Sequence, residues 1–199
     1  MPVKRQIPDS HGIYFITFTC VRWLKLFQIT DSYDLVYQWF DYLISKGHHV
    51  IGFVIMPNHI HAIIAFRNTG KRINTIIGNG KRFMAYELVE RLKDSDFYFL
   101  LEPMSNWVAF FDKARNKKHE VFESSFDWKE CNSVEFIEQK LDYIHTNPCK
   151  GNERLAEHPA EYEHSSAAFY INNIQGRVRI TTFLEMQDID LFKVTETSP

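Results

Sequence analysis

The spacing of hydrophobic and polar residues along the chain follows two periods, one typical of strands and one typical of helices. Residues 12–21, 50–56 and 60–66 are rich in β-branched and aromatic side chains, which predicts that each forms a strand. Pro57 and Asn58 are turn-forming residues, and they stand between the second and third segments. These two segments are therefore predicted to pair as a β-hairpin.

Apolar residues recur at helical spacing in residues 32–46 and 72–93, which predicts two helices. Asp31 is suited to cap the first helix, because its carboxylate can accept hydrogen bonds from backbone N–H groups. The second helical pattern contains Gly78 and Gly80, and glycine is a poor helix former. These are the positions at which we expect any break in that helix.

The second half of the chain carries fewer signals. Residues 119–128 are predicted to form a fourth strand, and residues 176–183 can form an additional one. Asn132 followed by Glu135 resembles a capping box, in which two side chains satisfy backbone N–H groups at the start of a helix. That helix must end before Pro148, because the residue before a proline disfavours helical backbone angles.

The predicted order is strand, helix, strand, strand, helix, strand, with one further helix. This order is typical of an α+β protein with the split βαβ arrangement of ferredoxin-like folds, an antiparallel sheet with helices on one face. At 199 residues the chain suits one domain, which we assign to residues 1–151, with residues 152–199 as a C-terminal extension. Residues 94–118 show no clear period and are long for a connection, which predicts an insertion or a functional loop.

Composition narrows the class of protein. Apolar residues make up 45% and charged residues 24% of the chain, as in an ordinary globular protein. No apolar run approaches the roughly 20 residues that a membrane span requires, and no secretion signal is recognisable. The cysteines Cys20, Cys131 and Cys149 are odd in number and widely spaced, so they predict neither disulfides nor a zinc site. We therefore expect a cytoplasmic protein that does not enter a membrane.

The charged residues are unevenly distributed. The formal net charge of −2 argues against a protein that coats nucleic acid without regard to its sequence. Four of the six residues in 113–118 are nevertheless cationic, and a longer cluster contains Lys71, Arg72, Lys81 and Arg82. Such clusters are more often solvated than engaged in binding, so they assign no function by themselves.

The first motif whose side chains are suited to metal binding is His59-Ile60-His61. Side chains alternate between the two faces of a strand, so the two imidazoles point the same way and Ile60 points oppositely. Two adjacent imidazoles on a rigid strand provide half of a metal site. The alternative is a pair of polar residues on an exposed strand face, and the spacing alone favours that alternative.

The second motif lies in the last predicted helix. Tyr143 and Asn147 are four residues apart and share one helix face, whereas His145 points elsewhere. A tyrosine is a nucleophile only if its phenol, with a pKa near 10, loses its proton as it attacks, and a nearby metal or imidazole would help. Asn147 offers an amide oxygen as a third metal ligand. Taken alone, such a tyrosine is usually a surface residue.

The two motifs together resemble a known family, the REP-associated tyrosine transposases, which belong to the single-tyrosine HUH transposases. Three segments carry the resemblance: residues 14–18 with Arg22 and Phe27, residues 54–61, and residues 143–148 with Lys150 and Gly151. A weaker match covers residues 159–166, where the family usually has tryptophan at the position of His164. The chain departs from the family at Cys149, usually a small aliphatic residue, and in the greater length of 94–118.

The resemblance implies a set of roles. His59 and His61 would hold Mg²⁺ or Mn²⁺, Asn147 would be the third ligand, and Tyr143 would be the nucleophile of a catalytic domain formed by residues 1–151. Only the resemblance names these metals, because Mg²⁺ ordinarily prefers oxygen ligands.

The implied reaction cleaves and rejoins single-stranded DNA next to a hairpin, such as a repetitive extragenic palindrome, through a 5′-phosphotyrosine. Lys71, Arg72, Lys81 and Arg82 are our candidates for holding the hairpin. The protein would act as a monomer or a homodimer.

Two other functions fit parts of this pattern. A domesticated protein could bind DNA hairpins without cutting them, although such a protein needs neither the histidine pair nor the tyrosine. A small metallohydrolase could use the histidine pair with water as the nucleophile, which leaves the tyrosine helix unexplained. A covalent protein–DNA adduct would distinguish all three functions.

Overall fold

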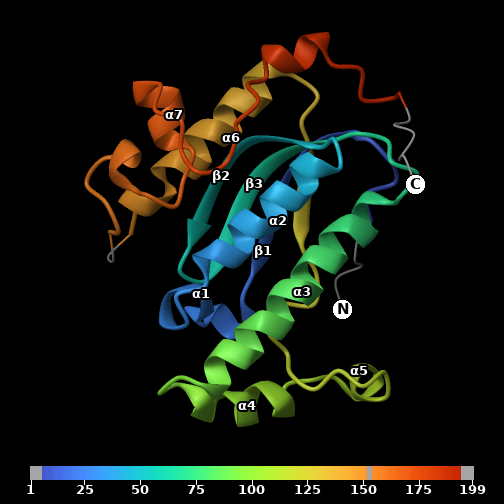
Figure 1. Ribbon diagram of the computed structural model, residues 1–199, viewed down its shortest axis with the longest axis vertical. Coiled ribbons are helices and arrows are strands. Elements are labelled where there is room, and N and C mark those ends of the chain that lie inside the picture. The colour runs from blue at the N-terminus through green and yellow to red at the C-terminus, as the bar shows by residue number, and fades with distance from the viewer. Residues whose placement is uncertain (1–5, 152–153, 194–199) are drawn as a thin grey trace.

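The computed structural model describes residues 6–151 and 154–193, and its centre is a four-stranded antiparallel sheet (Figure 1). The strand order is β2-β3-β1-β4, which is the order of the ferredoxin-like arrangement, and the predicted fold class is confirmed. The predicted hairpin is also correct, because Met56 and His59 pair directly across its two-residue turn. The strands are β1 (Gly12–Thr19), β2 (His49–Met56), β3 (His59–Phe66) and β4 (Asp127–Glu130).

Helices cover both faces of the sheet (Figure 1). Alternation along β1 sends Tyr14, Ile16 and Phe18 into the core beneath α2 and α3, and sends Phe15 into a smaller core beneath α6. The two helices within the split βαβ unit therefore share one face, and the additional helix that carries Tyr143 occupies the other. These helices are α2 (Tyr33–Ser45), α3 (Ile73–Lys93) and α6 (Val134–Thr146).

Helix α3 is continuous, so no break occurs at Gly78 or Gly80. Gly80 lies directly against the indole of Trp39 in α2, and an added Cβ would lie 2.6 Å from Cδ1 of that ring. Glycine therefore serves here to bring two helices close together. The predicted cap of α2 is wrong, because Asp31 adopts a positive φ of 46° and Ser32 is the residue before the helix.

Helix α6 begins after Ser133, whose hydroxyl accepts a hydrogen bond from the Phe136 N–H at 3.2 Å. The predicted cap at Asn132 is therefore one residue too early, whereas the predicted end before Pro148 is correct. The helix sits close to β2 because Gly52 has no side chain, and an added Cβ there would collide with Cδ2 of Leu141.

The fourth strand differs from its prediction. Only residues 127–130 pair with β1, while the 120–122 region makes a single bridge between Phe122 and Cys20. Two backbone hydrogen bonds, from Val21 N–H to the Val121 carbonyl at 2.8 Å and from Glu123 N–H to the Thr19 carbonyl at 2.9 Å, hold this region beside the end of β1 without a continuous ladder. Val121 and Phe122 instead bury their side chains in the larger core.

The predicted insertion, residues 94–118, is built of short helical turns, and Met104 anchors it in the core. The short helical elements of the chain are η1 (Val21–Trp23), α1 (Leu26–Ile29), η2 (Tyr98–Leu100), α4 (Leu101–Asn106), α5 (Phe110–Lys113), η3 (Asn147–Cys149), η4 (Pro159–Glu161), α7 (Ala167–Asn172) and η5 (Glu185–Asp188).

The C-terminal segment covers the outer edge of β2. The N–H of Ile55 donates to the carbonyl of His164 at 2.8 Å, and the N–H of Thr181 donates to the carbonyl of Val50 at 3.0 Å. Residues 176–183 make too few ladder hydrogen bonds to be a strand, so that prediction is wrong. The segment still protects a sheet edge that would otherwise expose unpaired backbone groups. Across the described ranges, no helix is both long and apolar enough to cross a bilayer.

Candidate active site at the start of β3

His59 and His61 are the first and third residues of β3, and they lie on the face of the sheet that α6 covers. Their ring centroids are 4.7 Å apart. Burial lowers the pKa of His59 to about 4, and burial together with the charges of His59 and Lys140 lowers the pKa of His61 to about 3. Both imidazoles are therefore neutral at pH 7, which is the form that binds a metal ion.

A hydrogen bond fixes the orientation of each imidazole. Nδ1 of His59 lies 2.7 Å from the amide oxygen of Asn58, which can only accept, so Nδ1 carries the proton and Nε2 keeps its lone pair. Nδ1 of His61 lies 2.6 Å from the hydroxyl of Thr17 on the neighbouring strand. When that nitrogen donates, Nε2 of His61 is also an acceptor. Such outer contacts orient the imidazole ligands of metal sites.

Helix α6 brings Tyr143 to this pair. The phenol ring lies 5.2 Å from the His61 ring and 6.1 Å from the Phe15 ring, centroid to centroid, and 41% of the residue is exposed. His145, two residues later, points the other way, where its Nε2 lies 2.8 Å from the Ser166 hydroxyl. The helix thus presents Tyr143 to the site and uses His145 to attach itself to the C-terminal segment.

Two lysines flank the phenol. The ammonium of Lys140 lies 5.7 Å from the centre of the Tyr143 ring, and that of Lys150 lies 5.8 Å from it. No sequence motif points to Lys140, although its position three residues before Tyr143 places both on one helix face. These cations can attract a phosphate and stabilise a phenolate.

Asn147 follows the last residue of α6, one turn beyond Tyr143, and is half-buried. Among the described residues its side-chain amide has no hydrogen-bond partner. The same part of the chain contains no group of three or more His, Cys, Asp and Glu side chains that could hold a metal. If the two imidazoles had a third protein ligand, it would be of another type, such as an amide oxygen.

No protein-family model matches the chain, and no curated protein matches it either. The solved structure of a REP-associated tyrosine transposase bound to a REP hairpin matches it with a TM-score of 0.56 and 13% identity, over 100% of this chain and 98% of the other. The chain has the fold of a REP-associated tyrosine transposase. A protein from Deinococcus radiodurans R1, provisionally assigned as a transposase, matches with a TM-score of 0.37 and 15% identity over 78% of this chain, which is too weak for a conclusion.

Two of the predicted DNA contacts, Lys81 and Arg82, lie on α3, which covers the opposite face of the sheet from α6 and Tyr143. Lys71 and Arg72 are exposed just before α3, and Arg82 is exposed on that helix. The ammonium of Lys81 donates to the carbonyls of Glu123 at 2.8 Å and Ser125 at 3.1 Å, so it also holds the loop before β4. The structure therefore does not bring these four residues together with the candidate catalytic residues.

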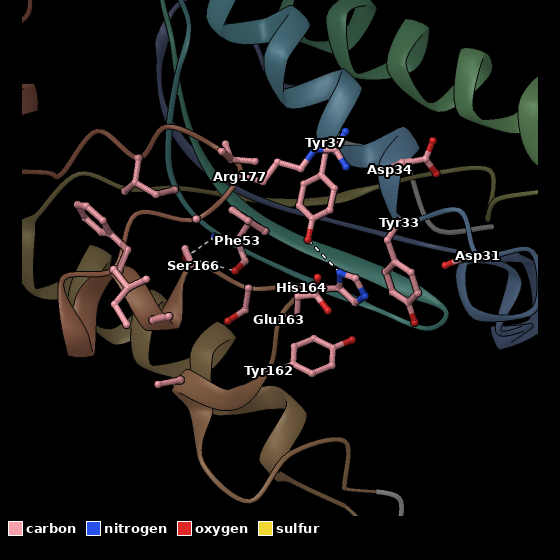
Figure 2. Close-up of a pocket in the computed structure, with 18 of the residues that line it drawn as sticks. Asp31, Tyr33, Asp34, Tyr37, Phe53, Tyr162, Glu163, His164, Ser166 and Arg177 are labelled. Atoms are coloured by element: carbon pink, nitrogen blue, oxygen red, sulfur yellow. Dashed lines mark hydrogen bonds between the residues drawn. The ribbon is translucent and has the colours of Figure 1, made fainter.

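A cavity of about 670 Å³ lies at the edge of β2, between α2 and the C-terminal segment (Figure 2). His164 stacks on Tyr33 with a centroid distance of 3.7 Å, and its Nδ1 lies 2.9 Å from the hydroxyl of Tyr37. His164 thus packs against aromatic rings and is oriented by a hydroxyl. The cavity includes neither histidine of the β3 pair, and its aromatic contacts fix the C-terminal segment beside β2.

Proposed function

We propose that this protein is a DNA-strand transferase of the REP-associated tyrosine transposase group, which cleaves and rejoins single-stranded DNA. The main support for the proposal is that three side chains from distant parts of the sequence lie close together in the structure. His59 and His61 form a pair of neutral imidazoles, and Tyr143 lies within 5.2 Å of the second ring. The likeness of the whole chain to the fold of such a transposase supports the same function.

In this proposal Tyr143 is the nucleophile. Its oxygen forms a bond to the phosphorus of the DNA backbone while the bond from phosphorus to the 3′ oxygen breaks, and the phenol proton passes through solvent to that leaving oxygen. The products are a 5′-phosphotyrosine and a free 3′-hydroxyl. The hydroxyl of a second strand end then attacks the same phosphorus and returns the tyrosine, so the reaction needs no ATP.

The residues around Tyr143 have supporting roles. Lys140 and Lys150 hold positive charge beside the ring, where it favours both the phosphate and the phenolate. His59, His61 and Asn147 would hold a divalent ion, Mg²⁺ or Mn²⁺. When bound, such an ion neutralises charge on the phosphate and orients it.

We further propose that the substrate is single-stranded DNA beside a hairpin. A flexible strand can turn its phosphate in line with the phenol oxygen, whereas a stacked duplex holds its backbone fixed. The protein in the matching structure was solved with a REP hairpin. The exposed cations Lys71, Arg72 and Arg82 stay our candidates for the phosphates of the stem, which they would hold away from Tyr143 while the adjoining unpaired strand reaches it.

A gel assay for a covalent adduct tests the proposal. The protein is incubated with Mn²⁺ and a labelled single strand that contains a hairpin, and denaturing electrophoresis should show a labelled protein band. The band should be absent for Tyr143→Phe. It should be present for Tyr86→Phe, which removes the hydroxyl of another exposed tyrosine, 61% exposed on α3. The same sequence in a perfect duplex should give no adduct.

The alternative functions predict different bands. A protein that only binds hairpins would shift the labelled strand in a native gel without any adduct or cut. A metallohydrolase would cut the strand without an adduct, and Tyr143→Phe would cut equally well. Either result would overturn the assignment of Tyr143 as the nucleophile.

A further inference from the structure

Trp23 lies beside the histidine pair, and the proposed reaction gives it no role. Its ring centroid is 5.6 Å from that of His59, and 63% of the residue is exposed. Tryptophan side chains are usually covered, because the indole is a large apolar surface. The other tryptophans of the chain are buried or half-buried. The structure therefore presents one indole to solvent at the edge of the candidate active site.

The backbone holds this indole in an unusual conformation. Arg22 and Trp23 have φ angles of 49° and 60°, in the left-handed region that residues with a side chain rarely adopt. The N–H of Arg22 donates to the carboxylate of Glu123 at 2.9 Å, and the N–H of Trp23 donates to the carbonyl of Cys20 at 3.1 Å. Such conformations persist only where the surroundings impose them, and they concentrate at functional sites.

Asn58 connects this segment to the histidine pair. Its Nδ2 donates to the carbonyl of Trp23 at 3.3 Å, while its Oδ1 accepts from Nδ1 of His59 at 2.7 Å. One amide thus fixes both the position of Trp23 and the proton position on His59. Arg22, the residue before the indole, is exposed and extends its guanidinium over the Trp107 ring at 4.4 Å. A flat aromatic surface therefore lies beside the site, and the residue before it carries a positive charge.

We propose that Trp23 is a stacking platform for an unpaired base of the DNA strand held at this site, with Arg22 close to that strand's phosphates. The inference rests on the proposed function, and it names a contact that the reaction itself does not require. A strand that presents its phosphate to Tyr143 lies beside the histidine pair, and the exposed Trp23 ring contacts His59 of that pair. Aromatic rings bind single strands in this way with little sequence preference, because every base has a flat face.

Binding measurements without cleavage test the platform. The full chain with Tyr143→Phe is titrated against a fluorescent oligothymidylate of about ten nucleotides, a length within the usual range of single-strand sites. Adding Trp23→Gly should weaken binding by about 5- to 150-fold, the range found when one base–aromatic stack is removed. Trp23→Phe should stay within a few-fold of the parent. Tyr42→Ala, which removes a ring that is 48% exposed on α2, should leave the affinity unchanged.

Two controls separate stacking from other roles. Glycine adopts a positive φ readily, so Trp23→Gly should unfold at the same or a higher temperature than the parent. A lower melting temperature with unchanged DNA affinity would make Trp23 a packing residue. An abasic oligonucleotide of equal length and charge should bind the parent and Trp23→Gly equally. An equal loss for both oligonucleotides would overturn base stacking.

The outcome is distinguishable from a failure of the proposed function. If the wild-type chain forms no covalent adduct while Trp23→Gly still weakens oligothymidylate binding, strand transfer fails and the platform stands. If the adduct forms and Trp23→Gly binds oligothymidylate as the parent does, the platform is wrong. A change of sedimenting mass in Trp23→Gly, without a change in DNA affinity, would assign the indole to contact with a second copy of the chain.

Discussion

Gly78 and Gly80 of α3 allow a test of how α2 and α3 pack, because the same substitution should have opposite effects at two neighbouring positions. An alanine Cβ at Gly78 would have no atom within 4 Å, whereas at Gly80 it would lie 2.6 Å from Cδ1 and 2.8 Å from Cε2 of Trp39. The indole is buried and packs between Phe18 and Phe40, so it has little room to move away.

The expected magnitudes follow from these contacts. Alanine in a helix interior is about 1 kcal/mol more favourable than glycine, and both variants gain this contribution. Overpacking a core costs about 1–3 kcal/mol, and several contacts below 3.0 Å place Gly80→Ala at the upper end. Gly78→Ala should therefore raise the free energy of unfolding by about 1 kcal/mol, and Gly80→Ala should lower it by about 2 kcal/mol.

Thermal unfolding followed by circular dichroism measures both effects. For a domain of this size, 1 kcal/mol corresponds to about 2–4 °C in melting temperature. Gly78→Ala should melt about 2–4 °C above the wild type, and Gly80→Ala about 4–8 °C below it. If Gly80→Ala instead melts as high as Gly78→Ala, Trp39 does not lie against this glycine, and the described packing of α2 on α3 is wrong.

Three further predictions concern the site and the buried imidazoles. Thr17→Val removes the hydroxyl that orients His61 through its Nδ1. We expect the Mn²⁺ concentration for half-maximal adduct formation to rise about 10- to 100-fold. An unchanged concentration would contradict the role of Thr17 in orienting this imidazole. Adding EDTA should stop adduct formation, Mg²⁺ or Mn²⁺ should restore it, and His59→Ala should resist that rescue; adduct formation in EDTA would remove the metal from the proposal. Burial lowers the pKa of His48 from 6.5 to about 4, and its Nδ1 accepts the N–H of Arg67 at 3.1 Å. Between pH 6.5 and pH 4 the unfolded chain therefore takes up a proton that the folded chain excludes. The contribution of His48 to the free energy of unfolding is complete above pH 6.5 and falls by up to about 3 kcal/mol as the pH approaches 4. Urea titrations should show a shallower fall for His48→Asn, and an identical profile would contradict the assignment.

The sequence alone was sufficient to predict the elements in which buried side chains recur at a regular period. The strands at 12–21, 50–56 and 60–66 and the hairpin turn between the last two were predictable, because burial of one face leaves a local signal. The same alternation placed His59 and His61 side by side, which the structure confirms. The fourth strand could not be placed in this way, since only residues 127–130 pair with β1 and no local signal within 119–128 marks that boundary.

Only the tertiary structure decided what surrounds the histidine pair. Periodicity predicts which face of the helix carries Tyr143, but not which part of the protein that face packs against. The phenol reaches His61 because α6 lies close against β2, and that approach depends on the missing Cβ of Gly52 beneath Leu141. Similarly, no period marks Trp23, whose conformation is imposed by hydrogen bonds from segments far along the chain.

The physical reason for this division is the range of the forces involved. Backbone hydrogen bonding and one-sided burial act over a few residues and repeat, so they leave patterns along the sequence. The distance between a phenol on a helix and an imidazole on a strand is set by close packing across the sheet, to which many side chains contribute small contacts. A sequence therefore identifies the residues that are chemically able to act, and the packed structure determines which of them lie close together.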